Sequence, residues 1–144
     1  MRDRRREPGS VVIEVVWLAV LLLVPLVYVV LAVFEVQRGA FAATAAARAA
    51  GRAYVLAPTP AEGEMRARAA SRVALSDQGV AQGRSAMTLV CRPSCLAPGS
   101  VVHVRVGHQV PLPLLPTMLG GQAPSIRVEA EHTVPYGTFR EDRS

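Results

Sequence analysis

The sequence predicts an α+β protein, with a long amino-terminal transmembrane helix followed by a small exterior domain of one helix and a three-stranded antiparallel sheet. Three observations predict this: an almost uncharged apolar run over residues 11–34, an Ala/Arg-rich helix-forming stretch after it, and alternating apolar and polar residues toward the carboxyl end. We divide the chain into a leader over 1–9, a transmembrane and protruding helix over 10–55, and an exterior α+β domain over 56–144.

The apolar run has the length and the flanks of a membrane span. It contains one charged side chain, Glu14, and as a helix it extends about 36 Å, against the ~30 Å of a bilayer core. Four arginines precede it at positions 2, 4, 5 and 6, and positive flanks stay cytoplasmic. We therefore expect a single-pass cell-membrane protein in contact with lipid, with its amino terminus cytoplasmic and its carboxyl-terminal domain extracytoplasmic.

Three interpretations compete for the amino-terminal segment. A secretory signal peptide has a shorter apolar core than this run and no acid inside it. A plain signal anchor fits the length and the arginines but leaves Glu14 unexplained, because a carboxylate in the membrane costs a few kcal/mol unless it lies near the interface and reaches water. The third interpretation is a leader that a peptidase removes.

The run Gly9-Ser10-Val11-Val12-Ile13-Glu14-Val15 resembles a type IV prepilin processing site. The resemblance implies that a prepilin peptidase cuts after Gly9, so that Ser10 becomes the first residue and Glu14 the fifth. It also implies that Glu14 pairs with the new α-amine of a neighbouring subunit. Val15 departs from the family, in which many members have Phe at this position.

Within pilin-like proteins, the chain is similar to the TadE-like family, the minor pseudopilins of tight-adherence pili. The similarity rests on the processing site, on Pro25 partway along the apolar helix, and on the Ala/Arg-rich continuation over 34–54. It implies a structural and assembly component of a type IVb-like pilus or related secretion system, located in the membrane or in a surface pilus. The implied partners are prepilin peptidase, other pilin or pseudopilin subunits and the inner-membrane assembly platform.

The protruding part of the helix is expected to reach about residue 55, which gives it roughly 69 Å from Ser10. Pro25 removes one backbone hydrogen bond and bends the axis, either neutrally or as part of packing. Phe41, Ala45, Arg48 and Arg52 recur on one face, and Gly39 and Gly51 are positions where the helix loosens. A membrane-proximal stalk and a pilin-like spine both fit this shape.

The exterior domain begins where Pro58-Thr59-Pro60 breaks the helix. Thr59 reads as the N-cap of a second helix over about 60–76. Period-two patterns predict strands over 86–91, 100–110 and 125–134. We expect the second helix to cover one face of this sheet and Arg105 to lie across from Glu129. The apolar, Pro-rich loop over 111–124 either packs locally or forms a docking patch.

Cys91 and Cys95 are the only cysteines, and outside the membrane they are expected to form a disulfide. A metal site is the rival interpretation, and it would need His103, His108 or His132 to converge on the two thiolates. The spacing matches no zinc pattern, and C-x3-C differs from the redox C-x2-C motif. We therefore expect no metal and no cofactor.

The remaining function classes have little support in the sequence. All sixteen basic residues are Arg and lie dispersed beyond residue 6, so they form no predicted nucleic-acid footprint. No nucleophile elbow, HExxH motif or phosphate-binding glycine loop occurs, so we expect no enzyme. The alternative to the pilin-like function is an uncleaved, membrane-anchored domain that binds a partner at the cell surface.

Overall fold

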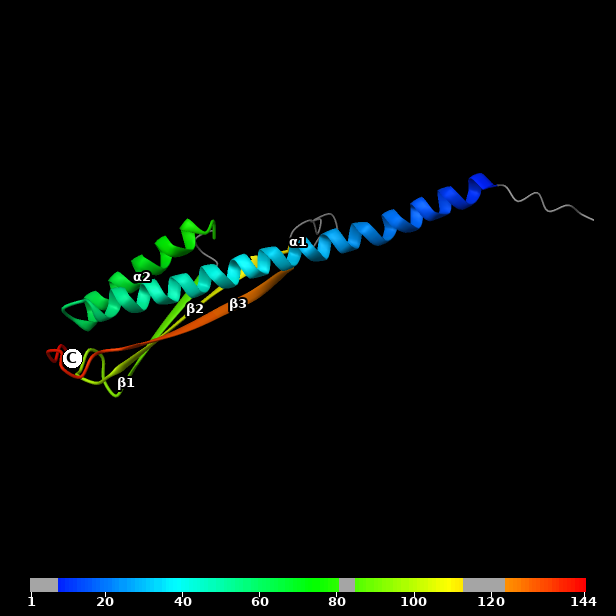
Figure 1. The fold of residues 1–144 in the computed structure, drawn as a ribbon. Coiled ribbons are helices and arrows are strands. Elements are labelled where there is room, and N and C mark those ends of the chain that lie inside the picture. The colour runs from blue at the N-terminus through cyan, green and yellow to red at the C-terminus, as the bar shows by residue number, and fades with distance from the viewer. Residues whose placement is uncertain (1–7, 81–84, 113–123) are drawn as a thin grey trace, which may run out of the picture.

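The computed structural model describes residues 8–80, 85–112 and 124–144, and in that part of the chain it confirms the α+β architecture. The elements follow the order α1 (Pro8–Val55), α2 (Pro60–Asp77), β1 (Ser85–Arg92), β2 (Val101–Pro111) and β3 (Ser125–Pro135). Figure 1 shows one long helix whose far half carries both α2 and the sheet, while its amino-terminal half extends alone.

Helix α1 has two halves of different surroundings. From Val11 to Val27 every side chain is exposed, and nearly all of them are apolar. From Ala42 onward the helix enters a core, and Ala42, Ala46 and Ala50 are fully buried. Among the described residues, α1 is therefore the one helix long and apolar enough to cross a membrane, with the candidate span running from Val11 to Val55.

The buried half of α1 packs directly on β2 and β3. Its buried residues are mostly glycine and alanine, with Tyr54 and Val55 at the end, so the helix backbone lies close to the strands. A Cβ added at Gly39 would lie 2.5 Å from Val110 Cγ2, and one at Gly51 would lie 2.6 Å from Val134 Cγ2. Gly39 and Gly51 are thus close-packing positions within a continuous helix, which corrects the expectation that they loosen it.

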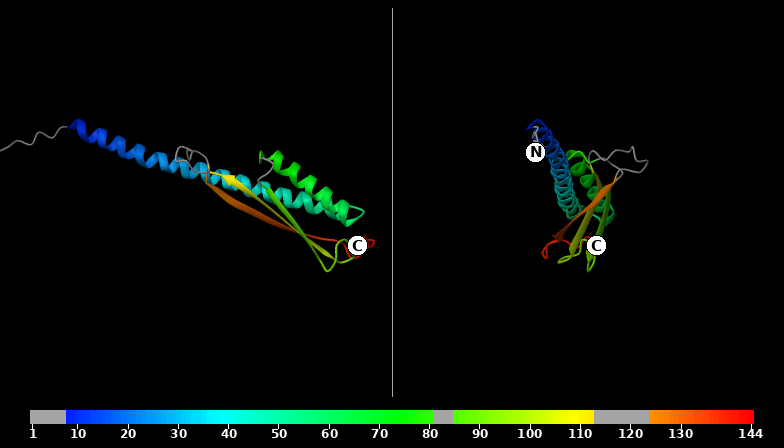
Figure 2. Two further views of the ribbon diagram at one scale, coloured as in Figure 1. Left: turned by 180° about the vertical axis from the view of Figure 1, so that it is seen from behind. Right: turned by 90° about the vertical axis from the view of Figure 1, so that its right-hand side faces the viewer.

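Helix α2 starts as the sequence predicts. Thr59 is the N-cap, and its hydroxyl accepts a hydrogen bond from the Glu62 backbone N–H at 3.3 Å. The small buried residues of α2 face α1, and a Cβ added at Gly63 would lie 3.0 Å from the Tyr54 ring. The expected cover of the sheet is wrong, however: α1 covers it, while α2 packs on α1 and touches the sheet mainly at β1. Figure 2 shows the same arrangement from two further sides.

The sheet is antiparallel in the order β1-β2-β3. Val102, Val104 and Val106 of β2 are fully buried against α1, as their alternation predicts. The expected pair of Arg105 and Glu129 is wrong by two residues, because the register places Arg105 opposite Glu131 and Gly107 opposite Glu129. The length of the connection between β2 and β3 sets this register, and most of the predicted 111–124 loop lies outside the described residues.

The carboxyl-terminal segment returns to the end of α1. Arg140 donates a hydrogen bond to the Val55 carbonyl at 3.0 Å, and Arg143 donates one to the Ala57 carbonyl at 3.3 Å. The Arg140 guanidinium also lies 4.7 Å from the centre of the buried Tyr136 ring. These contacts satisfy carbonyls that a helix end leaves without partners, and they tie the last residues to the core.

Candidate functional site

The predicted processing and assembly residues lie together at the beginning of α1. Gly9 and Ser10 are in its first turn, and Glu14 follows one turn later. The Glu14 side chain is exposed among apolar neighbours such as Ile13 and Trp17, which are 62% and 70% exposed. No salt bridge within the described part of the chain involves Glu14. Its carboxylate is therefore available to a group from outside those residues.

Pro25 lies inside α1, and the helix continues through it to Val55. Its neighbours Val24 and Leu26 are 60% and 57% exposed. A proline at this place removes one backbone hydrogen bond in the part of the helix that has no packing partner among the described residues. The bend that we assign to Pro25 stays a prediction.

A second site lies where α1 leaves its apolar half. A cavity of about 180 Å³ opens there between α1, the end of α2 and β2. Arg38 of α1 lines it and donates two hydrogen bonds, at 3.1 and 2.9 Å, to the Gln78 carbonyl. Gly79 has a φ of +73°, and a Cβ on it would lie 2.5 Å from Arg38 Nη2. Arg38 therefore fixes the end of α2 against α1.

His108 of β2, which the sequence suggested only as a possible metal ligand, lies beneath the same junction. It is 3% exposed, its Nδ1 has no hydrogen-bond partner among the described residues, and burial lowers its pKa. A Cβ on Gly39 would lie 3.1 Å from His108 Nε2. The sequence contains a signal for this position, because 102, 104, 106, 108 and 110 share one face of β2.

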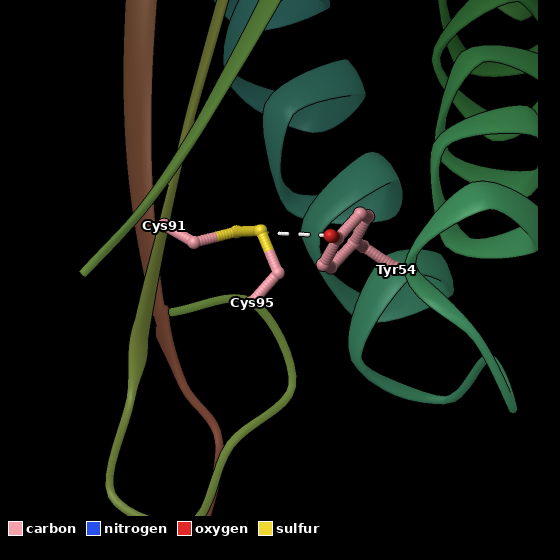
Figure 3. Close-up of a disulfide and its surroundings, with 3 residues drawn as sticks. All are labelled: Tyr54, Cys91 and Cys95. Atoms are coloured by element: carbon pink, nitrogen blue, oxygen red, sulfur yellow. Dashed lines mark hydrogen bonds between the residues drawn. A yellow bond between two sulfur atoms is a disulfide. The ribbon is translucent and has the colours of Figure 1, made fainter. Parts of the chain in front are cut away.

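Cys91 and Cys95 are bonded to each other, with their Cα atoms 5.0 Å apart. Neither sulfur is then available as the thiolate ligand that the metal interpretation requires. The Tyr54 hydroxyl donates a hydrogen bond to Cys91 Sγ at 3.6 Å (Figure 3). Burial, and the nearby charge of Glu64, raise the pKa of Tyr54. The disulfide thus closes the turn after β1, and the hydrogen bond from Tyr54 joins that turn to the end of α1.

The outer face of the sheet carries a line of exposed charged residues. Arg105 donates to Glu131 at 2.9 Å, and His103 Nδ1 lies 3.3 Å from the same carboxylate. The Arg105 hydrogen bond and charge lower the pKa of Glu131. Exposed pairs of this kind contribute little to stability. We therefore interpret the outer face of the sheet as a solvated surface rather than a binding site.

The three comparisons with known proteins give no assignment. No family model, no curated protein and no solved structure matches this chain. The function must therefore be argued from the residues and their arrangement.

Proposed function

We propose that this chain is a TadE-like minor pseudopilin, a structural and assembly subunit of a tight-adherence pilus or related secretion system. The observation that carries the proposal is Glu14, an acid on an otherwise apolar and exposed helix surface, one turn after Gly9 and Ser10. The four leader arginines support an amino terminus on the cytoplasmic side, where a prepilin peptidase acts.

The chemistry of the cut explains why an acid belongs at this position. Cleavage after Gly9 creates an α-amine on Ser10, and such an amine has a pKa near 7.7–8.0, so it is mostly protonated at neutral pH. A carboxylate about 4 Å away attracts it by roughly 4 kcal/mol at an effective dielectric constant of ~20. Glu14 of one subunit and the amine of its neighbour offset each other's desolvation, and this sets the register between two helices.

The shape of the molecule also suits this function. One uninterrupted helix supplies both the apolar half and the support for the exterior domain. The exposed apolar half offers a surface for lipid and for the equivalent helices of other subunits. An uncleaved surface anchor shares this shape, so the processing site has to separate the two functions.

The first test is the mass of the mature chain. Full-length protein is co-expressed with its prepilin peptidase, extracted from membranes and analysed by mass spectrometry. We expect a chain that begins at Ser10, and we expect Gly9→Val to keep the leader because the resemblance places the cut after a glycine. Assembly-competent protein that retains the leader would contradict the proposal and favour the uncleaved anchor.

The second test concerns Glu14. Glu14→Ala and Glu14→Gln should both insert and be cut, yet both should lose co-purification with other pilus subunits. Glu35→Ala is the matched control, since it removes an acid from the same helix just beyond the apolar half, and it should co-purify normally. Equal recovery of partners with all three variants rules out the pairing of Glu14 with an amine.

A further inference from the structure

A groove runs between α2 and β1 on the exterior domain. Two adjoining cavities of about 280 and 450 Å³ form it, and both include Arg68 of α2 and Met87 of β1. The buried ring of Tyr54 lines the larger cavity, and Figure 3 shows this ring beside the disulfide. We call this feature the α2–β1 groove and define it by Tyr54, Ala61, Arg68, Arg72, Met87 and Leu89.

The groove exists because the sheet is narrow relative to the helix pair. α1 packs on β2 and β3, and α2 lies beside α1 and touches the sheet mainly at β1. Packed helices are about 8–10 Å apart, whereas strands are about 4.8 Å apart. The width of one helix therefore matches about two strands. Among the described residues, β1 is the one strand beside α2, which leaves the width of a second strand open.

β1 presents an open edge to the groove. It is the first strand in the order β1-β2-β3, and no other described strand pairs with it. Every second residue of an antiparallel edge strand turns its N–H and C=O away from the sheet, where they can bind another strand. Met87 and Leu89 are half-buried on the inner face of β1, so an added strand would continue an apolar surface.

The charges of the groove select the kind of strand. Arg68 is paired with Glu64, but Arg72 forms no ion pair with any described residue, and its Nε donates only to the Arg68 carbonyl at 3.3 Å. Arg72 lies beside the start of β1, while Tyr54 and Leu89 lie farther along it. A strand that pairs antiparallel with β1 therefore has its amino-terminal end beside Tyr54 and Leu89. Its carboxyl-terminal end lies beside the Arg72 guanidinium.

We propose that the α2–β1 groove binds an extended segment of a partner protein, which adds to β1 as a fourth antiparallel strand and ends in acidic residues beside Arg72. Main-chain hydrogen bonds to β1 provide affinity, and the apolar and acidic side chains provide specificity. The proposal does not depend on removal of the leader, so it can fail or succeed independently of the pilin-like function.

The test uses full-length protein in lipid nanodiscs and a fluorescent synthetic peptide of alternating threonine and valine that ends in two aspartates. Fluorescence anisotropy gives its Kd. We expect saturable binding, weakened about tenfold or more by Arg72→Glu, since a charge-assisted pair is replaced by a repulsion. Arg127→Glu on the outer face of β3 is the matched control and should change the Kd by less than about twofold.

Two further peptides complete the experiment. A peptide ending in two lysines should bind the Arg72→Glu variant better than the original chain, because the charges are exchanged. A peptide with proline at alternate positions should not bind, because it lacks the backbone donors that a new strand needs. Absence of binding, or equal binding to all variants, overturns the proposal. It is also overturned if light scattering finds a dimer that Arg72→Glu dissociates, since the occupant is then a second copy.

Discussion

Gly51→Ala gives the sharpest test of how α1 meets the sheet. On an open helix face this change stabilises by about 1 kcal/mol, because alanine is the better helix former. Here the new Cβ would lie 2.6 Å from Val134 Cγ2, about 1 Å inside normal carbon contact. Overpacking of this kind costs about 1–3 kcal/mol, so we expect a net loss of about 0–2 kcal/mol.

The sign of the effect should reverse when Val134 is shortened. In a Val134→Ala background the clashing methyl is absent, and Gly51→Ala should stabilise by about 1 kcal/mol. The two changes are then coupled by about 1–3 kcal/mol, as expected for residues in contact. Ala45→Gly on the exposed face of α1 is the control and should cost about 1 kcal/mol.

The measurement is urea-dependent protease resistance of the full-length chain in detergent micelles. Equilibrium unfolding of the exterior domain is read from the fraction of intact protein at each urea concentration. Stabilisation by Gly51→Ala in the original background, or the same effect in both backgrounds, refutes the close approach of α1 to β3.

Two other predictions follow from the contacts of the core. Burial lowers the pKa of His108 below its ordinary value of 6.5, so the unfolded chain binds the extra proton first. The stabilising contribution of neutral His108 is complete above that value and is lost as the pH falls through it, by at most about 1.4 kcal/mol per pH unit. Urea titrations at several pH values should show a weaker acid dependence in His108→Gln than in the control His103→Gln, and equal slopes would refute the assignment. The second prediction is that the double change Cys91→Ser and Cys95→Ser costs about 2 kcal/mol, because the bridge closes only a short loop. If the same protease assay finds that the chain does not fold without the disulfide, the disulfide contributes far more than about 2 kcal/mol to the free energy of unfolding, and the prediction is wrong.

Much of the fold could be predicted because local signals agree with the tertiary structure. Pro58-Thr59-Pro60 breaks one helix and begins the next, and the structure has α2 at Pro60–Asp77. The three strands agree with their period-two patterns to within a residue or two. The disulfide is present between the two predicted cysteines.

The relations between elements were harder to predict. Alanine and glycine at 39–51 carry little hydrophobic signal, so periodicity did not indicate that this part of α1 covers the sheet. The register of Arg105 depends on the connection before β3, and alternation alone fixes only which face a residue occupies. His108 was considered only as a ligand, although its place in the alternation of β2 predicts burial.

The candidate site divides in the same way. Gly9, Ser10 and Glu14 could be proposed from sequence because the cleavage and pairing that we propose depend on a short linear motif. The α2–β1 groove could not, because it arises from the difference between helix and strand spacing and from residues of three separate elements. A site built from such distances becomes visible only once the elements are placed.

The uninterrupted course of α1 has a mechanical consequence. The helix is continuous from the apolar half to the half that packs on the sheet. The sheet and α2 therefore rotate together with the apolar half as one rigid unit. Each residue by which α1 rotates about its axis swings the domain through about 100° of azimuth. Any contact that fixes the rotation of the apolar half would therefore also fix the direction in which the sheet and α2 point.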